Sequence, residues 1–75
     1  MLLAVQKKIK SAPDFAGVYM MKSANGQIIY IGKAKSLKKR LSDYLAKDLP
    51  IKTVALMVKV RDIDYLICEN ENMAL

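Results

Sequence analysis

Histidine is absent from this 75-residue chain, and cysteine occurs once, at Cys68. Without an imidazole there is no Ser-His or Cys-His nucleophile, no histidine-ligated zinc and no histidine general base. A single cysteine cannot form an internal disulfide, which favours a reducing compartment. These two shortages exclude the commonest nucleophilic hydrolases and histidine-based metal enzymes.

Long apolar runs are also missing. None approaches the ~20 residues that a membrane-spanning helix needs. The opening residues Met1 to Val5 are too few for the apolar core of a signal peptide, and lysines follow them rather than precede them. We therefore expect a cytoplasmic protein that makes no use of a membrane.

Acidic residues are scarce and unevenly placed. Residues 1–61 hold 13 basic and three acidic side chains, a net charge of +10, whereas residues 62–75 hold four acidic side chains and no basic one. A basic body suggests binding to nucleic acid or to an anionic membrane, although solubilising charge explains a net +6 equally well. Because 53% of the residues are hydrophobic, we expect one small folded domain rather than a disordered tail.

Residues 30–40 form the stretch around which the chain is organised. An apolar run ends at Gly32, and five cations follow within eight residues: Lys33, Lys35, Lys38, Lys39 and Arg40. Ser36 is suited to cap a helix that starts there. Lysines at a helix start oppose the helix dipole, and free N–H groups at that position bind phosphate. We therefore expect an anion site at this helix start.

A hairpin precedes this stretch. A short helix is expected around Leu2, Val5 and Ile9, and strands over residues 15–22 and 27–31, joined by a two-residue turn at Asn25-Gly26. Such a turn places Ala24 opposite Gln27, Met21 opposite Tyr30 and Tyr19 opposite Gly32.

This register brings Tyr19 and Tyr30 together on one face of the sheet, and leaves the other face to Val18, Met20, Ile29 and Ile31. Ordinary core packing of two aromatic rings is the alternative to a chemical role for the tyrosines.

Two helices and a strand are expected downstream. The helix from Ser36 to about Ala46 buries Leu37, Leu41 and Leu45, with Arg40 and Tyr44 together on one edge. Arg40 is then either a long side chain lying over the core or a bidentate phosphate clamp. A second helix is expected to bury Ile51, Val54, Ala55 and Val58. A strand over residues 63–68 and another helix start at residues 69–72 would follow.

These motifs resemble those of the GIY-YIG nucleases. The pattern consists of Gly17-Val18-Tyr19, the hairpin, Tyr30-Ile31-Gly32, Lys33 and Arg40. With Ala12-Pro13 upstream and Tyr44 downstream, the chain is similar over most of its length to the amino-terminal nuclease domains of the UvrC excision-repair subunits. The resemblance implies an α+β fold with a small three-stranded antiparallel sheet flanked by helices.

The resemblance also implies an activity: hydrolysis of a DNA phosphodiester with one divalent ion, Mg²⁺ or Mn²⁺. In UvrC, this domain cuts damaged double-stranded DNA on the 3′ side of the lesion after the partner UvrB has engaged it. The site residues implied by position are Tyr19, Tyr30, Lys33, Arg40 and Tyr44, with Gly17 and Gly32 as spacers where the backbone passes close to substrate.

The residue types fit this chemistry. Without histidine, the general base is a tyrosine phenolate or a metal-bound hydroxide, and the sequence leaves open whether Tyr19 or Tyr30 serves. Arg40 is suited to hold the scissile phosphate, and Lys33, Lys35, Lys38, Lys39 and Arg40 to bind DNA.

The chain departs from the family pattern at its metal ligand. The glutamate that binds the metal in the family aligns just beyond Leu75, and Glu69 and Glu71 do not match it. We therefore expect residues 1–75 to be a single domain cut off before its metal-ligand helix, inactive alone and without a tightly bound metal. The alternatives are a DNA-binding module without catalysis and a free-standing GIY-YIG nuclease unrelated to excision repair.

Overall fold

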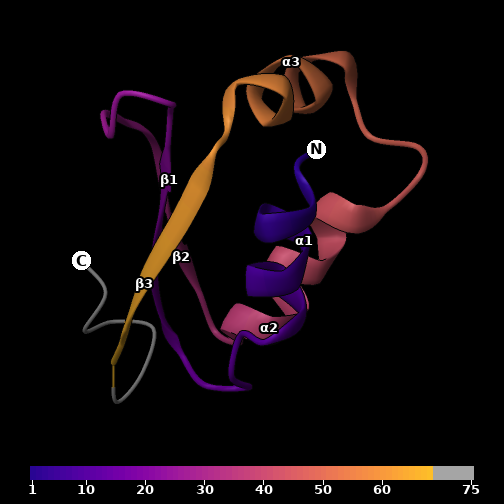
Figure 1. Ribbon diagram of the computed structural model, residues 1–75. Coiled ribbons are helices and arrows are strands. Elements are labelled where there is room, and N and C mark those ends of the chain that lie inside the picture. The colour runs from indigo at the N-terminus through magenta and orange to yellow at the C-terminus, as the bar shows by residue number, and fades with distance from the viewer. Residues whose placement is uncertain (69–75) are drawn as a thin grey trace.

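The computed structural model describes residues 1–68, and the helix start expected at residues 69–72 lies outside them. The elements follow in the order α1 (Leu3–Lys10), β1 (Gly17–Lys22), β2 (Ile28–Ala34), α2 (Leu37–Ser42), a 3₁₀ turn (Asp43–Leu45), α3 (Ile51–Lys59) and β3 (Asp62–Ile67) (Figure 1). The predicted α+β fold is confirmed. Among the described residues, no helix has the length and hydrophobicity needed to cross a membrane.

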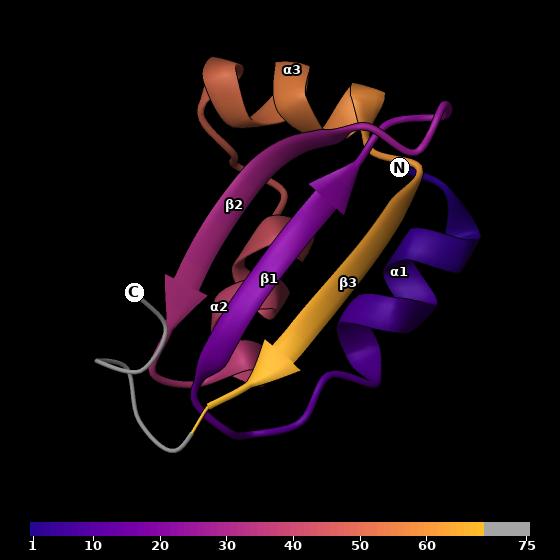
Figure 2. The same ribbon diagram turned by 90° about the vertical axis from the view of Figure 1, so that its left-hand side faces the viewer.

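The three strands form one antiparallel sheet in the order β2-β1-β3, and the helices lie on one of its faces (Figure 2). Alternate residues of β1 point to the helices, so Tyr19 and Met21 are fully buried while Val18 and Met20 on the other face are half-buried. The buried core joins the sheet to the helices through Val5, Ile9, Ala12, Tyr19, Met21, Ala34, Leu37, Leu41, Tyr44, Met57, Val60 and Ile63.

The hairpin differs from the expected two-residue turn. Gly26 has a positive φ of 81° but no other described residue does, and Ser23 N–H donates to the Gln27 carbonyl, so three residues form the loop. A register shift between Met21 and Lys22, where Lys22 pairs with Ile28, then adds one residue to β2. The longer loop and this bulge cancel, and the expected pairs Met21–Tyr30 and Tyr19–Gly32 are confirmed.

Three other details of the hairpin prediction are wrong. The pairing of Ala24 with Gln27 is absent, and Ile29 packs against the core instead of lying on the open face, because the bulge interrupts the alternation of side chains. The first strand begins at Gly17 rather than at Phe15, which is 60% exposed.

The helix after β2 is shorter than expected. Its α-helical part ends at Ser42, and the chain tightens into the 3₁₀ turn rather than continuing to Ala46. Leu37 and Leu41 are fully buried as predicted, and Leu45 packs against the core while remaining partly exposed.

The helix α3 forms where a second helix was expected, but it buries the opposite face. The expected core residues are exposed: Ile51 by 88%, Val58 by 63% and Val54 by 47%. Met57 and Val60 are buried instead, with Leu56 packed beside them. This prediction was wrong because positions 53, 56, 57 and 60 repeat at the same helical spacing as positions 51, 54, 55 and 58.

Candidate active site

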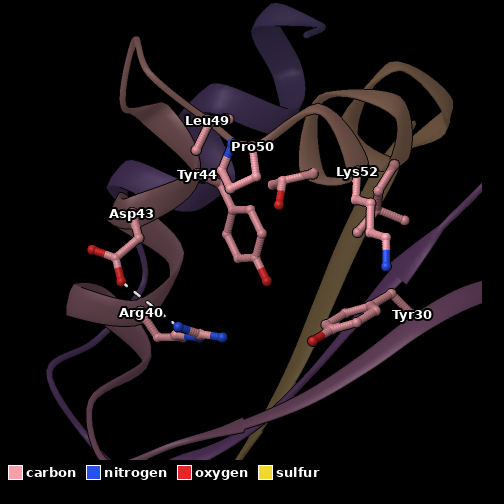
Figure 3. A pocket seen from close by; sticks show the side chains of 9 residues that line it. Tyr30, Arg40, Asp43, Tyr44, Leu49, Pro50 and Lys52 are labelled. Carbon is pink, nitrogen blue, oxygen red and sulfur yellow. Dashed lines mark ion pairs between the residues drawn. The ribbon is translucent and has the colours of Figure 1, made fainter.

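A pocket of about 500 Å³ lies between β2, the α2 region and α3 (Figure 3). Tyr30 contributes from the sheet, and Lys52 contributes from the first turn of α3. The full lining is Tyr30, Arg40, Asp43, Tyr44, Leu49, Pro50, Lys52, Thr53 and Leu56. The pocket is therefore built from segments that are up to 26 residues apart in the chain.

Tyr19 of β1 holds two of the lining residues, Arg40 and Tyr44, in place. The Tyr19 and Tyr44 hydroxyl oxygens are 2.8 Å apart and form a buried hydrogen bond. The Nε of Arg40 donates to the Tyr19 hydroxyl at 3.4 Å. The Tyr19 side chain is fully buried, so it does not line the pocket. It supports the side chains of Arg40 and Tyr44.

These contacts change the proton affinities of the groups. Burial, followed by the hydrogen bond to Tyr19, raises the pKa of the Tyr44 phenol, and Arg40 offsets only part of this effect. The hydrogen bond to Tyr19 raises the pKa of the Arg40 guanidinium. At neutral pH, Tyr44 is therefore a neutral phenol and Arg40 a full cation.

Tyr30 differs from the other two tyrosines because it is open to solvent. Its side chain is 38% exposed, and its ring lies 6.1 Å from that of Tyr19, centroid to centroid, at an interplanar angle of 35°. Figure 3 shows its hydroxyl directed into the same space as the Tyr44 hydroxyl and the Arg40 guanidinium. The expected grouping of Tyr19 with Tyr30 on one face is present.

Arg40 also forms an ion pair with Asp43. Its Nη1 lies 3.9 Å from a carboxylate oxygen of Asp43, three residues on. Asp43 is the first residue of the 3₁₀ turn that follows α2, so this ion pair joins the end of the helix to the turn.

Lys33 does not line the tyrosine pocket. It lines a neighbouring hollow of about 370 Å³ with Ala34, Lys35, Ser36, Lys39, Arg40 and Asp43. Arg40 and Asp43 belong to both hollows, so Arg40 joins the tyrosines to the lysine-rich surface. Lys38 is exposed and lines neither of them.

The start of α2 provides no free amides for an anion. Leu37 N–H donates to the Phe15 carbonyl at 2.9 Å, and Lys38 N–H to the Pro13 carbonyl at 3.0 Å. Ser36 is the predicted N-cap and accepts from Lys39 N–H at 3.2 Å. Its own hydroxyl donates to Asp14, which already places a negative charge there. The expectation of a phosphate site on these amides was therefore wrong, and any anion must be bound by side chains.

A family model described as the UvrC-like GIY-YIG domain matches residues 15–75. The chain belongs to this UvrC-like GIY-YIG family. It is 49% identical over 69 residues to the UvrABC system protein C of Methanococcoides burtonii, and 46% identical over 67 residues to that of Coxiella burnetii strain RSA 331. Each alignment covers 89% of this chain but only 11% of the relative.

Solved structures agree with the family assignment. The magnesium-bound GIY-YIG endonuclease domain of Thermotoga maritima UvrC superimposes with a TM-score of 0.90 at 36% identity, over 99% of this chain and 81% of that one. Three further structures of the same domain each carry one tyrosine-to-phenylalanine replacement, and each is bound to the catalytic divalent cation.

The two glycines of the UvrC-like GIY-YIG pattern make room for the protein itself. A Cβ at Gly32 would overlap the ring of Tyr19 on the paired strand, and a Cβ at Gly17 would overlap the Leu66 carbonyl. The space at each glycine is taken by these neighbours, rather than by a substrate as the sequence suggested.

The described part of this UvrC-like GIY-YIG domain does not form a metal site. Within residues 1–68, no three His, Cys, Asp or Glu side chains lie close enough together to hold a metal ion. Asp43 is the carboxylate in the pocket, and it lies beside Arg40. A hard divalent cation needs several oxygen ligands, so these residues do not fit one by themselves.

Sequence reasoning missed Lys52 and Thr53 as lining residues, and it gave Asp43 no place in the pocket. A signal was present for Lys52: Pro50 marks the start of a helix, and a lysine in the first turn opposes the helix dipole. The segment was instead interpreted through its apolar residues.

Proposed function

We propose that this chain is the DNA endonuclease domain of a UvrC-type excision-repair protein and hydrolyses a phosphodiester in its tyrosine pocket. The observation that carries the proposal is the buried Tyr19–Tyr44 pair, which receives the Arg40 Nε and holds the guanidinium at the pocket beside Tyr30. Family membership supports the reaction class, since the Thermotoga maritima relative is an endonuclease domain.

Arg40 is the proposed clamp for the scissile phosphate. A guanidinium carries five N–H donors, and Tyr19 engages only the one on Nε. The remaining donors can bind two phosphate oxygens at once and stabilise the charge that accumulates during displacement. Half of the Arg40 side chain is exposed, so a phosphate can reach it.

Tyr30 is the better placed of the two candidate bases. The Tyr19 hydroxyl is fully buried and already engaged with Tyr44 and Arg40, whereas the Tyr30 hydroxyl faces the open pocket (Figure 3). Only a phenolate can take a proton from water, and nearby cations stabilise that negative charge. Tyr44 and Tyr19 act by positioning, and Lys33 by attracting DNA to the adjoining hollow.

A divalent cation completes the proposed site. We propose that the chain works with one Mg²⁺ or Mn²⁺, whose ligands are not supplied by the described residues alone. The substrate is damaged double-stranded DNA, the incision lies on the 3′ side of the lesion, UvrB is the partner and the cytoplasm is the compartment. These finer statements are part of the proposal, because the chain aligns with only 11% of the relatives' length.

A DNA-binding role without cleavage is the second candidate. It is favoured by one observation, the lack of a carboxylate cluster among the described residues. The basic surface from Lys33 to Arg40 would bind DNA in either case.

The test is plasmid nicking by a chimera that joins this chain to the remaining part of the Thermotoga maritima domain, of which it covers 81%. With Mg²⁺ or Mn²⁺ the chimera should nick supercoiled DNA, and Arg40→Ala should abolish nicking. The melting temperature should fall by only a few degrees, as for a surface change of about 1 kcal/mol or less. Lys59→Ala, at an exposed lysine of α3 that lines neither hollow, is the control. Full nicking by Arg40→Ala would contradict the proposal.

A further inference from the structure

A second cation lines the tyrosine pocket on the wall opposite Arg40. Lys52 extends from the first turn of α3, and its ammonium group points toward Tyr30 across the space from the Arg40 guanidinium (Figure 3). The two cations come from different elements and flank the two phenols that face the pocket.

Lys52 has no carboxylate partner within residues 1–68. The ion pairs of this region join Lys8 and Lys22 to Asp62 and Asp64, and Arg40 to Asp43. Asp43, the acidic residue of the pocket, therefore lies beside the other cation. Among the described residues, the positive charge of Lys52 is therefore not neutralised by a carboxylate.

Helix stability does not explain this lysine. It is the second residue of α3, whose first turn contains no acidic side chain and whose N-cap, Pro50, makes no side-chain hydrogen bond. A cation there opposes the positive end of the helix dipole and is unfavourable. A neutral residue would serve the fold at least as well.

We propose that Lys52 is a substrate-contacting residue that binds the phosphate next to the one held by Arg40, an inference that rests on the proposed function. Consecutive phosphates of one strand would then bridge the two walls and carry the scissile bond past Tyr30. A pocket of about 500 Å³ is within the usual size range of ligand sites. A lysine suits this contact because it acts as a point charge without a fixed geometry.

The control for this assignment is on the same helix. Lys59 follows Lys52 by seven residues, which places it on the same side of α3, roughly 10.5 Å further along. It is exposed and lines none of the hollows described here. The two lysines therefore carry equal charge and differ in their access to the pocket.

The experiment measures binding of the 75-residue chain to a fluorescently labelled DNA duplex by anisotropy, between about 50 and 200 mM salt. Lys52→Gln should weaken binding roughly three- to tenfold and reduce the slope of log K against log salt by about one. Lys59→Gln should leave the slope unchanged, and Lys52→Arg should restore it. The melting temperature of Lys52→Gln should not fall, because an unfavourable charge is removed from the helix start.

Two outcomes would overturn the assignment. If Lys52→Gln matches Lys59→Gln in affinity and slope while Arg40→Gln weakens binding, Lys52 is a solvated surface lysine and the proposed function stands. If the unaltered chain shows no salt-dependent DNA binding, the proposed function fails and the role of Lys52 fails with it.

Discussion

At the scale of single residues, the four groups brought together by the site have distinct duties. Tyr19 and Tyr44 are buried and bonded to each other, Arg40 is anchored on Tyr19, and Tyr30 alone combines exposure with a hydroxyl in the pocket. Three identical side chains thus have different chemistry, because their surroundings differ.

Phenylalanine replacements of Tyr30 and Tyr19 should separate effects on catalysis from effects on stability. Tyr30→Phe in the chimera should reduce the nicking rate on the order of 10²-fold without changing the melting temperature, since its hydroxyl has no partner within the described region. Tyr19→Phe leaves the buried Tyr44 hydroxyl unpaired, which should lower the free energy of unfolding by about 1–2 kcal/mol as well as slowing nicking. Equal stability losses in the two variants would contradict this division, as would undiminished nicking by Tyr30→Phe.

Gly32 and Gly26 provide a second residue-scale contrast. Gly32→Ala should push the Tyr19 ring aside, cost about 1–3 kcal/mol of stability and stop nicking, because Arg40 depends on Tyr19. Gly26→Ala has free space but a φ of +81°, so it should cost about 1–2 kcal/mol through backbone strain and leave the nicking rate unchanged. Nicking is compared well below both melting temperatures, and normal activity of Gly32→Ala would show that Tyr19 can move.

The residues of the site were predictable only where local geometry decided them. The hairpin signal was enough to place Tyr19 beside Tyr30, and helical spacing was enough to associate Arg40 with Tyr44. The contribution of α3 to the pocket was not predictable, because it depends on how this helix packs over the sheet. Lys52 of α3 lies more than 20 residues after Tyr30 in the chain. Lys33 was assigned to the tyrosine site by its place in a motif, yet the structure puts it in the adjoining hollow.

At the scale of elements, α3 shows why a helix can be predicted without its orientation. Its sequence carries two apolar stripes on opposite sides, and the stripe with fewer polar atoms is the one left exposed. Periodicity selects a buried face only when the other face is polar. Met57 and Val60 lie in the core, so hydrophobicity alone did not select the buried face.

The attachment of α1 to β3 depends on pH. Lys8 pairs with Asp62 at 2.6 Å, and this hydrogen bond lowers the pKa of the Asp62 carboxyl and raises that of the Lys8 amine. A depressed carboxyl pKa gives stability that is present above the unfolded value of about 4 and is lost as pH falls through the folded value. Both side chains are 47% exposed, so the pair contributes at most about 1 kcal/mol.

Asp62→Asn should therefore lower the melting temperature by a few degrees at pH 7 and by nothing at pH 2, with a smaller effect in high salt. Asp48→Asn is the control, because Asp48 is exposed and has no ion pair within the described region. Thermal melts of both variants from pH 2 to pH 7 would check this. If Asp62→Asn lowered the melting temperature equally at pH 2 and at pH 7, the ion pair would not be the cause of the loss.

At the scale of the whole molecule, DNA binding is expected to depend on charge and DNA cleavage on a metal ion. The first 61 residues carry a net charge of +10, and in the proposed function this basic surface binds phosphates without a metal. Cleavage needs a cation that the described carboxylates do not gather. Binding and cutting should therefore be separable in the laboratory.

The 75-residue chain should bind DNA with an affinity that falls steeply as salt rises, and it should leave supercoiled plasmid intact with Mg²⁺ or Mn²⁺. The chimera serves as the positive control for cutting. Metal-dependent nicking by the chain alone that disappears in Asp43→Asn would instead place the metal at Asp43.

The cancelling loop and bulge at the tip of the hairpin have a practical consequence. The pairs from Met21–Tyr30 to Gly17–Ala34 set the register of the site, and the tip beyond them contributes no residue to the tyrosine pocket. Chain length can therefore vary at Asn25 and Gly26 as long as the strands still meet at Met21 and Tyr30. A spectroscopic label or a short affinity tag inserted between Asn25 and Gly26 should report on DNA binding without altering the residues that perform it.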